Sequence, residues 1–321
     1  MKVPAWQLGS WRNLRGAWSR AALGHALLFT GPQHIGKRAL AEALTARLLC
    51  EAAESEEMAC GRCRACALLA AGNHPDRREV GLLEREDGRL KTEIGVEQVR
   101  ALSAWFALTP QLGRAQVAII DPADHLHASA ANALLKTLEE PLPERFLLLL
   151  ATQPQRLPAT IRSRCQRLQL PLPAPAQARD AVLASGADAE AAEAALAAAD
   201  GNPGLALDYL AGDVMALRRA VHEDLAALAN GRLHAAPLAA AWVQDRPDLR
   251  LRFAAESVRD FGRRRAVAPA GLTALGDFPK LAAWFDHANR VRLQLDAPLR
   301  HELLLTGLLS EWSAAFERPA R

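Results

Sequence analysis

The sequence predicts an α/β domain, in which helices flank a parallel sheet, followed by regions that are helical throughout. The main observation is an apolar run (117–120), a helical stripe (129–140) and a second apolar run (146–152), in that order. Short, uninterrupted apolar runs are typical of strands buried on both faces of a parallel sheet. A helix between two such strands is the crossover unit of α/β folds. We expect Ser129 to cap the start of this helix and Pro141 to end it.

Length and charge limit the class of protein. At 321 residues, half of them apolar, the chain is long enough for two or three globular domains. Its net charge is +3, from 39 basic and 36 acidic residues, which is too balanced to indicate a nucleic-acid binder. The N-terminus lacks the apolar core of a signal peptide, and the longest clean apolar run, 146–151, is too short to span a membrane. We therefore expect a cytoplasmic protein with no membrane partner.

An apolar run at 25–30 is followed by a glycine-containing loop that opens a helix. The loop has the spacing Gly-x4-Gly-Lys of a P-loop, with Gly31, Gly36 and Lys37 at its fixed positions. In a P-loop, backbone N–H groups cradle phosphates and the lysine reaches the phosphate oxygens. Arg38 stands where a Ser or Thr hydroxyl would hold Mg²⁺, and arginine can only donate hydrogen bonds. The three residues are candidate nucleotide ligands of a degenerate P-loop, in which ATP binding is left open and hydrolysis is not expected.

Four of the five cysteines form a cluster after this helix. Their spacing is Cys50-x9-Cys60-x2-Cys63-x2-Cys66. Thiolates two residues apart on a turn can converge on one ion, and in a cytosolic chain such clustering favours a metal over disulfides. Four thiolates complete a tetrahedral zinc site and leave no position for water, so we predict a structural Zn²⁺ in a module at 50–66. His74 is an alternative ligand, although a turn residue is the simpler interpretation.

The central α/β unit carries further candidate residues. The strand at 117–120 ends at Asp121, and Pro122 follows it. The helix ends with two glutamates, Glu139 and Glu140, which we expect to be solvated because a helix C-terminus does not favour acidic side chains.

Four segments together resemble one family, the bacterial DNA polymerase III clamp loaders of the AAA+ class. They are Asp121 at a strand end, Asn132-Ala-Leu-Leu-Lys-Thr-Leu-Glu-Glu-Pro141, Ala151-Thr152 and Ser163-Arg164-Cys165. The resemblance covers 23–170 and is thin after that. It implies an AAA+ α/β module with a zinc-binding insertion, a small helical lid, and an all-α C-terminal collar domain that holds five subunits together.

The resemblance also implies roles for individual positions. In an active subunit of this family, the aspartate that positions Mg²⁺ is followed by a glutamate that orients the attacking water. Here Pro122 replaces that glutamate and offers no acid or base. Together with Arg38, this implies a subunit without independent ATPase activity. Arg164, with Ser163 and Cys165 completing its motif, matches an arginine finger that reaches the γ-phosphate of a neighbouring subunit's ATP. For Glu139 and Glu140, the match to the family segment implies a subunit contact as the alternative to a solvated helix end.

The segment 171–175 is the clearest domain boundary, because three prolines in five residues cannot continue a helix or a central strand. We therefore divide the chain into an AAA+ domain (1–170), a lid (171–211) and a collar domain (212–321). After the turn at 201–204, the lid lacks the arginine with which family members contact their own nucleotide. In the collar domain we expect helical segments near 213–230, 237–244, 247–265, 278–295 and 298–317.

The resemblance implies a subunit of the DNA polymerase III holoenzyme at the replisome, which helps to load the sliding clamp onto primed DNA. By the resemblance, its partners are motor subunits of the gamma/tau type and a delta-type subunit in a hetero-pentamer, and it meets the sliding clamp and primer-template DNA through that complex. One alternative is an ATP-hydrolysing motor subunit, against which Arg38 and Pro122 argue. The other is a zinc-dependent DNA-binding protein. Glu54, Glu56 and Glu57 beside the cysteines argue against it, because they repel phosphate.

Overall fold

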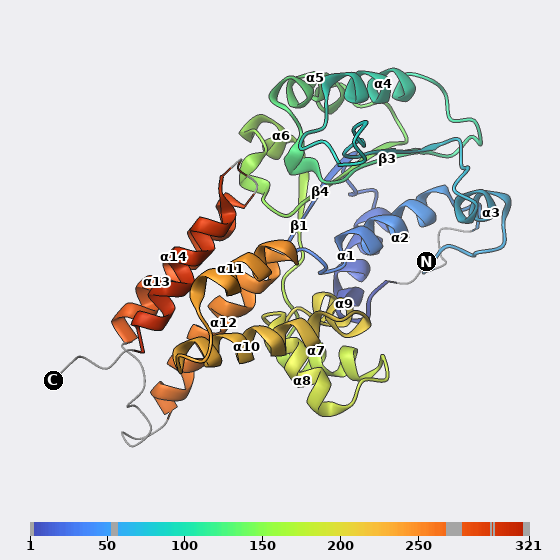
Figure 1. The fold of residues 1–321 in the computed structure, drawn as a ribbon. Helices are drawn as coiled ribbons and strands as arrows, with labels where there is room; N and C mark the ends of the chain where they lie inside the picture. Colours follow the sequence, from blue (N-terminus) through green and yellow to red (C-terminus); the bar gives the residue numbers. More distant parts are fainter. Residues whose placement is uncertain (1–2, 53–56, 268–277, 296, 298, 317–321) are drawn as a thin grey trace. The chain divides into compact units, whose positions relative to one another are not determined.

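The structure is a computed structural model that describes residues 3–52, 57–267, 278–295, 297 and 299–316 (Figure 1). The chain divides into two compact units. The first unit comprises Met1–Ala192 with Gly201–Leu205, and the second comprises Glu193–Asp200 with Ala206–Arg321. The division falls within 171–211, and the three-domain organisation with boundaries after 170 and 211 stays a prediction.

A five-stranded parallel sheet forms the centre of the first unit. Its strands are β1 (Ala26–Thr30), β2 (Arg77–Val80), β3 (Gln116–Ile120), β4 (Arg145–Ala151) and β5 (Gln166–Gln169). They lie in the order β2-β3-β4-β1-β5, and every neighbouring pair is parallel. The carboxyl ends of all strands therefore meet at one edge of the sheet. The α/β class with a parallel sheet and flanking helices is confirmed.

Helices cover both faces of this sheet (Figure 1). One face carries α4 (Val96–Phe106), α5 (Ala128–Glu139) and α6 (Ala159–Arg164), and the other carries α1 (Leu8–Ser19) and α2 (Lys37–Leu49). Alternate strand residues point to opposite faces. On β1, for example, Leu28 packs in the core with α4, α5 and α6, whereas Leu27 and Phe29 pack in the core with α1 and α2. Burial on both faces explains why the apolar runs are uninterrupted.

Short elements complete the first unit. They are α3 (Arg64–Ala70), α7 (Pro175–Leu183) and the 3-10 helices η1 (Ala5–Gln7), η2 (Ala123–His125) and η3 (Pro154–Arg156). The expected cap of α5 was wrong, because the capping residue lies two positions before Ser129. The helix begins at Ala128 rather than Ser129, and the side chain of His127 caps it by accepting a hydrogen bond from the Ser129 N–H at 3.2 Å. Histidine at this position can use an unprotonated ring nitrogen as the acceptor.

The second unit is helical throughout its described residues, as the sequence predicts. After α8 (Ala189–Ala198) and α9 (Pro203–Ala211), the helices are α10 (Val214–Ala229), α11 (Ala235–Gln244), α12 (Pro247–Val267), α13 (Phe278–Gln294) and α14 (His301–Ala314). Trp242, Trp284 and Trp312 are buried in its core. The indole rings of Trp284 and Trp312 meet edge to face at 4.8 Å, an arrangement that aromatic pairs favour.

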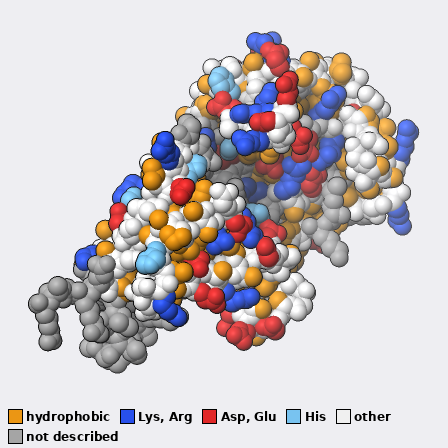
Figure 2. Space-filling model, viewed as in Figure 1, with side chains coloured by type: hydrophobic (Ala, Val, Ile, Leu, Met, Phe, Trp, Pro, Cys, Tyr) orange, Lys and Arg blue, Asp and Glu red, His pale blue; other side chains and the backbone are white. Residues whose placement is uncertain are grey.

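The surface carries charges of both signs. On the face shown in Figure 2, Lys and Arg side chains lie among Asp and Glu side chains, in keeping with the small net charge. In the described part of the chain, none of the helices combines the length and the apolar character needed to cross a bilayer.

Candidate functional site

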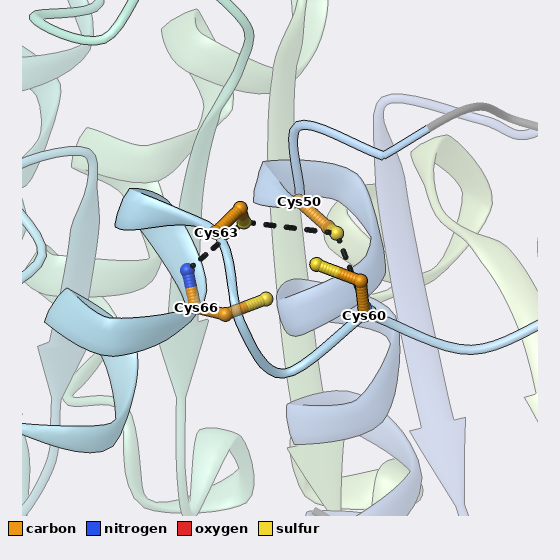
Figure 3. Close-up of side chains that lie close together, drawn as sticks. All are labelled: Cys50, Cys60, Cys63 and Cys66. Carbon is orange, nitrogen blue, oxygen red and sulfur yellow. Dashed lines mark hydrogen bonds between the residues drawn. The ribbon is translucent and has the colours of Figure 1, made fainter.

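The four clustered cysteines converge, as their spacing predicts (Figure 3). Cys50 follows the last residue of α2, Cys63 caps the start of α3, and Cys66 lies in the first turn of α3. Cys60 lies in the loop between the two helices. The four sulfur atoms all lie within 4.8 Å of one another, and those of Cys50 and Cys63 are 3.9 Å apart. The ends of two helices thus bring the cluster together.

This donor set fits a zinc ion. In a tetrahedral site with Zn–S bonds of about 2.3 Å, the sulfur atoms lie about 3.8 Å apart, so small shifts would bring all four to one ion. The backbone N–H groups of Ala52 and Cys60 donate to the Cys50 sulfur at 3.4 and 3.3 Å. The N–H of Cys66 donates to the Cys63 sulfur at 3.4 Å. Such donors favour the thiolate, which is the form that binds metal.

The pKa values of the thiols diverge within the cluster. Backbone hydrogen bonds from Arg62 and Cys63 lower the pKa of Cys60 to about 6. Burial raises the pKa of Cys66 to about 12. Because a thiol must lose its proton to bind zinc, metal binding at this cluster would release protons, above all from Cys66.

His74 lies outside the metal-ligating group that the described residues form. It is buried, and its Nδ1 accepts a hydrogen bond from the backbone N–H of Asp76 at 3.1 Å. The Asp76 carboxylate in turn accepts two backbone N–H groups from 111–112. Burial lowers the pKa of His74. These contacts favour the interpretation as a turn residue. Part of the cysteine module, 53–56, lies outside the described residues, and it includes two of the glutamates noted beside the cysteines.

A tight loop at 31–36, hereafter the glycine loop, leads from β1 into α2. Gly31 and Gly36 have φ angles of +149° and +102°, a region that favours glycine. A Cβ atom on Gly31 would lie 2.5 Å from the carbonyl oxygen of Leu170. The backbone geometry therefore requires both glycines, with or without a bound phosphate.

Lys37 is bound by the protein itself. Its side chain is buried, and Nζ donates to the carbonyl oxygens of Gly31 at 2.8 Å and Pro32 at 2.7 Å. Nζ also donates to Thr152 Oγ1 at 3.1 Å. An ammonium group has three N–H donors, and these contacts use all three. Burial lowers the pKa of Lys37, although two nearby aspartates oppose this. The lysine must give up these partners before it can reach a phosphate.

The turn at 201–204 packs directly on the glycine loop. Asn202 is buried, and its Nδ2 donates to the carbonyl oxygen of Gln33 at 2.7 Å. A Cβ atom on Gly204 would lie 1.8 Å from the carbonyl oxygen of His34, so only glycine permits this approach. The glycine loop is thus held by protein groups on both sides.

Arg38 places its guanidinium among three carboxylates. Nη1 donates to Asp121 Oδ2 at 3.1 Å, Nε donates to Glu42 Oε1 at 3.2 Å, and Nη2 pairs with Glu79. Arg77 completes this Arg38 network, because its Nη2 contacts both Glu42 and Glu79. Although burial opposes it, hydrogen bonds to Glu79 and Asp121 raise the pKa of Arg38. The guanidinium is therefore a permanent cation at this edge of the sheet.

An open cavity of about 670 Å³ lies beside these groups. Gly36, Lys37, Arg38, Asp121 and Pro122 are among its lining residues. The charged side chains gathered here are three cationic (Lys37, Arg38, Arg77) and four anionic (Glu42, Glu79, Asp121, Asp124). The two cations that line the cavity, Lys37 and Arg38, thus already lie close to carboxylates of the protein.

The residues after β3 supply no replacement for the missing glutamate. Asp121 and Pro122 are joined by a cis peptide bond, and Pro122 brings no acid or base to the cavity. Asp124 is buried, and its Oδ2 accepts the backbone N–H groups of Thr152 at 3.1 Å and Gln153 at 2.7 Å. These bonds tie the end of β4 to the turn after β3, which gives Asp124 a structural role.

Arg164 is the last residue of α6 and is exposed. Its Nη2 pairs with Glu139 Oε1 at 2.6 Å, and its Nη1 donates to the carbonyl oxygen of Thr160 at 3.0 Å. Ser163 is exposed, and its hydroxyl donates to the same carbonyl at 3.1 Å. Cys165 is buried, and burial raises its pKa to about 11. Arg164 is therefore the residue of the Ser163-Arg164-Cys165 motif that carries a charged group at the surface.

The sequence analysis did not identify the glutamates that pair with Arg38 and with Arg164. Glu42 lies four residues after Arg38 on α2, and this i,i+4 pair of opposite charges is a signal that the sequence offers. Glu79 lies on β2, an edge strand that no apolar run predicts. The sequence indicates a solvated Glu139, whereas its pairing with Arg164 depends on the packing of α5 against α6.

In comparisons with known proteins, the chain is similar to subunits of DNA polymerase III. A family model described as DNA polymerase III, delta subunit, matches residues 6–174. Over 239 residues the chain is 42% identical to DNA polymerase III subunit delta′ of Pseudomonas aeruginosa, which covers 74% of this chain and 70% of that protein. It is 34% identical over 231 residues to subunit delta′ of Escherichia coli, covering 70% and 66%. Among solved structures, it resembles a DNA polymerase III gamma-subunit-related protein of Thermotoga maritima (TM-score 0.46, 15% identity, covering 96% and 99%).

Proposed function

Because the chain belongs to the delta′ subunit family of DNA polymerase III, we propose that it works in the clamp loader without hydrolysing ATP and offers Arg164 to a neighbouring subunit's ATP. The family resemblance predicted from the sequence is thereby confirmed. The chain is a clamp-loader subunit of the polymerase, and two arginines, Arg38 and Arg164, support the proposal of how it acts there.

The bond between Arg38 and Asp121 carries the first half of this proposal. In ATPases with a P-loop, a hydroxyl of the loop and an aspartate at a strand end hold the Mg²⁺ that neutralises charge on the phosphates. Here the hydroxyl is absent, and Nη1 of Arg38 donates to Asp121 Oδ2 at 3.1 Å. A guanidinium on this oxygen leaves no place for a metal there. With Pro122 in place of the water-orienting glutamate, the chain lacks both the hydroxyl ligand of the metal and the base, which supports the absence of hydrolysis.

The exposure and charge of Arg164 support the second half. A planar guanidinium that is charged at every working pH can stabilise the charge that develops on a transferring phosphoryl group. Such fingers accelerate phosphoryl transfer by on the order of 10³-fold or more. Arg164 keeps an exposed side chain although this chain's own cavity has lost its catalytic groups. A subunit of this kind contributes to catalysis only across an interface.

The partners follow from this role. We propose that the chain joins motor subunits of the gamma/tau type and a delta-type subunit in a hetero-pentamer at the replisome, and that the complex opens the sliding clamp and loads it onto primed DNA. The all-helical second unit suits a collar that holds the subunits together. The cysteine cluster would carry a structural Zn²⁺ that orders the module between α2 and α3.

ATP turnover by the purified chain, with Mg²⁺ and primed DNA, tests the proposal directly. We expect no turnover by the chain alone and turnover once the motor subunits are added. Turnover by the chain alone that disappears in Lys37→Ala would instead identify it as a motor subunit. A complex that hydrolyses ATP equally well without this chain would remove the role in trans.

A further inference from the structure

The packing of α5 against α6 brings Glu139 and Arg164 together. Each is the last residue of its helix. Leu134 and Leu138 of α5 share one buried core with Ile161 of α6. Because this core fixes the two helices, it also fixes the separation of their ends. The fold therefore holds the two helix ends, from which Glu139 and Arg164 extend, within reach of each other.

Two contacts set the orientation of the Arg164 guanidinium. Nη2 pairs with Glu139 Oε1 at 2.6 Å, and Nη1 donates to the carbonyl oxygen of Thr160 at 3.0 Å. A guanidinium has five N–H donors in one plane, so two contacts fix that plane and leave three donors for another partner. The Arg164 side chain is 37% exposed, which leaves it accessible to such a partner.

Glu139 occupies a position that is unfavourable without this pairing. Carboxylates at a helix C-terminus face the negative end of the helix dipole. Glu139 offsets that repulsion by pairing with the Arg164 cation. The next residue, Glu140, is also exposed, but within the described part of the chain its side chain has no ion-pair partner. The two adjacent glutamates thus have the same charge and different contacts.

We propose that Glu139 is a positioning residue, which holds Arg164 in the orientation from which it reaches the γ-phosphate of the neighbouring subunit's ATP. This inference rests on the proposed function, since it assigns a second residue to the same arginine. A long arginine side chain loses much rotamer freedom when it binds, and a small misplacement of a catalytic group is costly in rate. Because Glu139 orients the guanidinium before the subunits meet, less rotamer freedom of Arg164 has to be lost when the transition state forms.

The substitution Glu139→Gln tests this in the complex reconstituted with motor and delta-type subunits. It removes the charge and keeps the size of an exposed side chain, so the fold should be unaffected. We expect kcat for ATP to fall about two- to fivefold, the scale of one exposed ion pair, with KM for ATP and complex assembly unchanged. Glu140→Gln is the matched control and should retain the wild-type kcat. An unchanged or increased kcat in Glu139→Gln would overturn the proposal.

A double variant separates this inference from the proposed function. If Glu139 acts only through Arg164, then adding Glu139→Gln to Arg164→Ala should lower kcat no further. A further loss would show that Glu139 acts elsewhere and would refute its role as a positioning residue. If Arg164→Ala alone leaves the turnover of the complex unchanged, the proposed function fails. If Arg164→Ala slows turnover and Glu139→Gln does not, only the inference about Glu139 fails.

Discussion

Arg38 donates a hydrogen bond from Nη1 to Oδ2 of Asp121 at 3.1 Å, at the edge of the sheet where a P-loop ATPase binds its metal. One residue therefore causes two losses, since it removes the hydroxyl ligand and also occupies the carboxylate ligand. The guanidinium supplies at this position a positive charge that Mg²⁺ would otherwise bring. The contacts of the Arg38 network are all made within the chain, which agrees with the proposed role of a subunit that does not hydrolyse ATP.

Replacing Arg38 should therefore restore part of a nucleotide site. Arg38→Thr supplies a hydroxyl and frees Asp121, so we expect ATP affinity in the presence of Mg²⁺ to rise by roughly tenfold or more. Turnover should remain absent because Pro122 is unchanged. Titration with a fluorescent ATP analogue, in Mg²⁺ and in EDTA, measures the effect. Arg38→Ala is the control, since it frees Asp121 without adding the hydroxyl. Equally tight Mg²⁺-ATP binding by the wild-type protein would contradict this prediction.

Removing one cysteine of the cluster should release the metal. We expect Cys63→Ser to lower bound zinc well below one per chain, because four thiolates complete the site and none is spare. Metal analysis of the purified protein gives the answer. Cys165→Ser, which changes a cysteine outside the cluster, should leave the zinc content unchanged. Since apparent zinc binding to such sites is worth about 10–16 kcal/mol, a strong chelator should also lower the melting temperature of the wild-type protein. Unchanged zinc in Cys63→Ser would remove the metal assignment.

Asp124 should matter for stability more than for chemistry. Its carboxylate accepts the backbone N–H groups of Thr152 and Gln153, and Asp124→Ala would remove the protein acceptor of both. We expect the free energy of unfolding to fall by about 2–4 kcal/mol, as measured by urea denaturation. Asp124→Asn keeps an acceptor oxygen and should lose less. Equal losses in the two variants would argue that the negative charge, and not the hydrogen bonding, is what stabilises the site.

Apolar patterning predicts only part of the sheet. The strands β1, β3 and β4 lie within one residue of the runs expected at 25–30, 117–120 and 146–152. The strands β2 and β5 escape prediction because they form the edges of the sheet, where most of their side chains are at least partly exposed and polar. An edge strand needs no apolar run, so its position is decided by pairing with a neighbour that the sequence does not reveal.

The candidate sites also differ in how far the sequence predicts them, depending on whether their residues are close together in the sequence. The cysteine cluster is local, because its four members lie within 17 residues of sequence, and their spacing suffices to predict that they converge. The loss of a metal ligand at Arg38 is also visible in the sequence. Its contact with Asp121 is not, because the two residues are 83 positions apart and meet only through the order of the strands. The pairing of Glu139 with Arg164 is hidden for the same reason.

Arg164→Ala should slow the ATPase of the assembled complex and leave assembly intact. The side chain is exposed at the surface, so its removal should not disturb the fold. At the ATP site that we propose Arg164 to contact, we expect a loss of up to about 10³-fold in hydrolysis. Arg167→Ala removes an exposed arginine three residues further on and is the control. Steady-state turnover and size-exclusion chromatography measure the two effects. Wild-type turnover in the Arg164→Ala complex would refute the role in trans.

Cys165 should make the folded state less stable at alkaline pH. Burial raises the pKa of its thiol from 9.0 to about 11. Between these values the unfolded chain loses a proton that the folded chain keeps. Because the unfolded state then binds fewer protons, the free energy of unfolding falls as pH rises, by up to about 1.4 kcal/mol per pH unit.

Comparison with Cys165→Ala isolates this contribution. At pH 8 the wild-type protein should be the more stable, because alanine leaves a small void in the core. The difference in free energy of unfolding between the wild-type protein and Cys165→Ala should fall by roughly 2 kcal/mol by pH 11, because only the wild-type protein has the thiol that titrates. Urea denaturation of both proteins at several pH values between 8 and 11 provides the measurement. A difference that stays constant over this range would mean that the thiol titrates alike in the folded and unfolded chains.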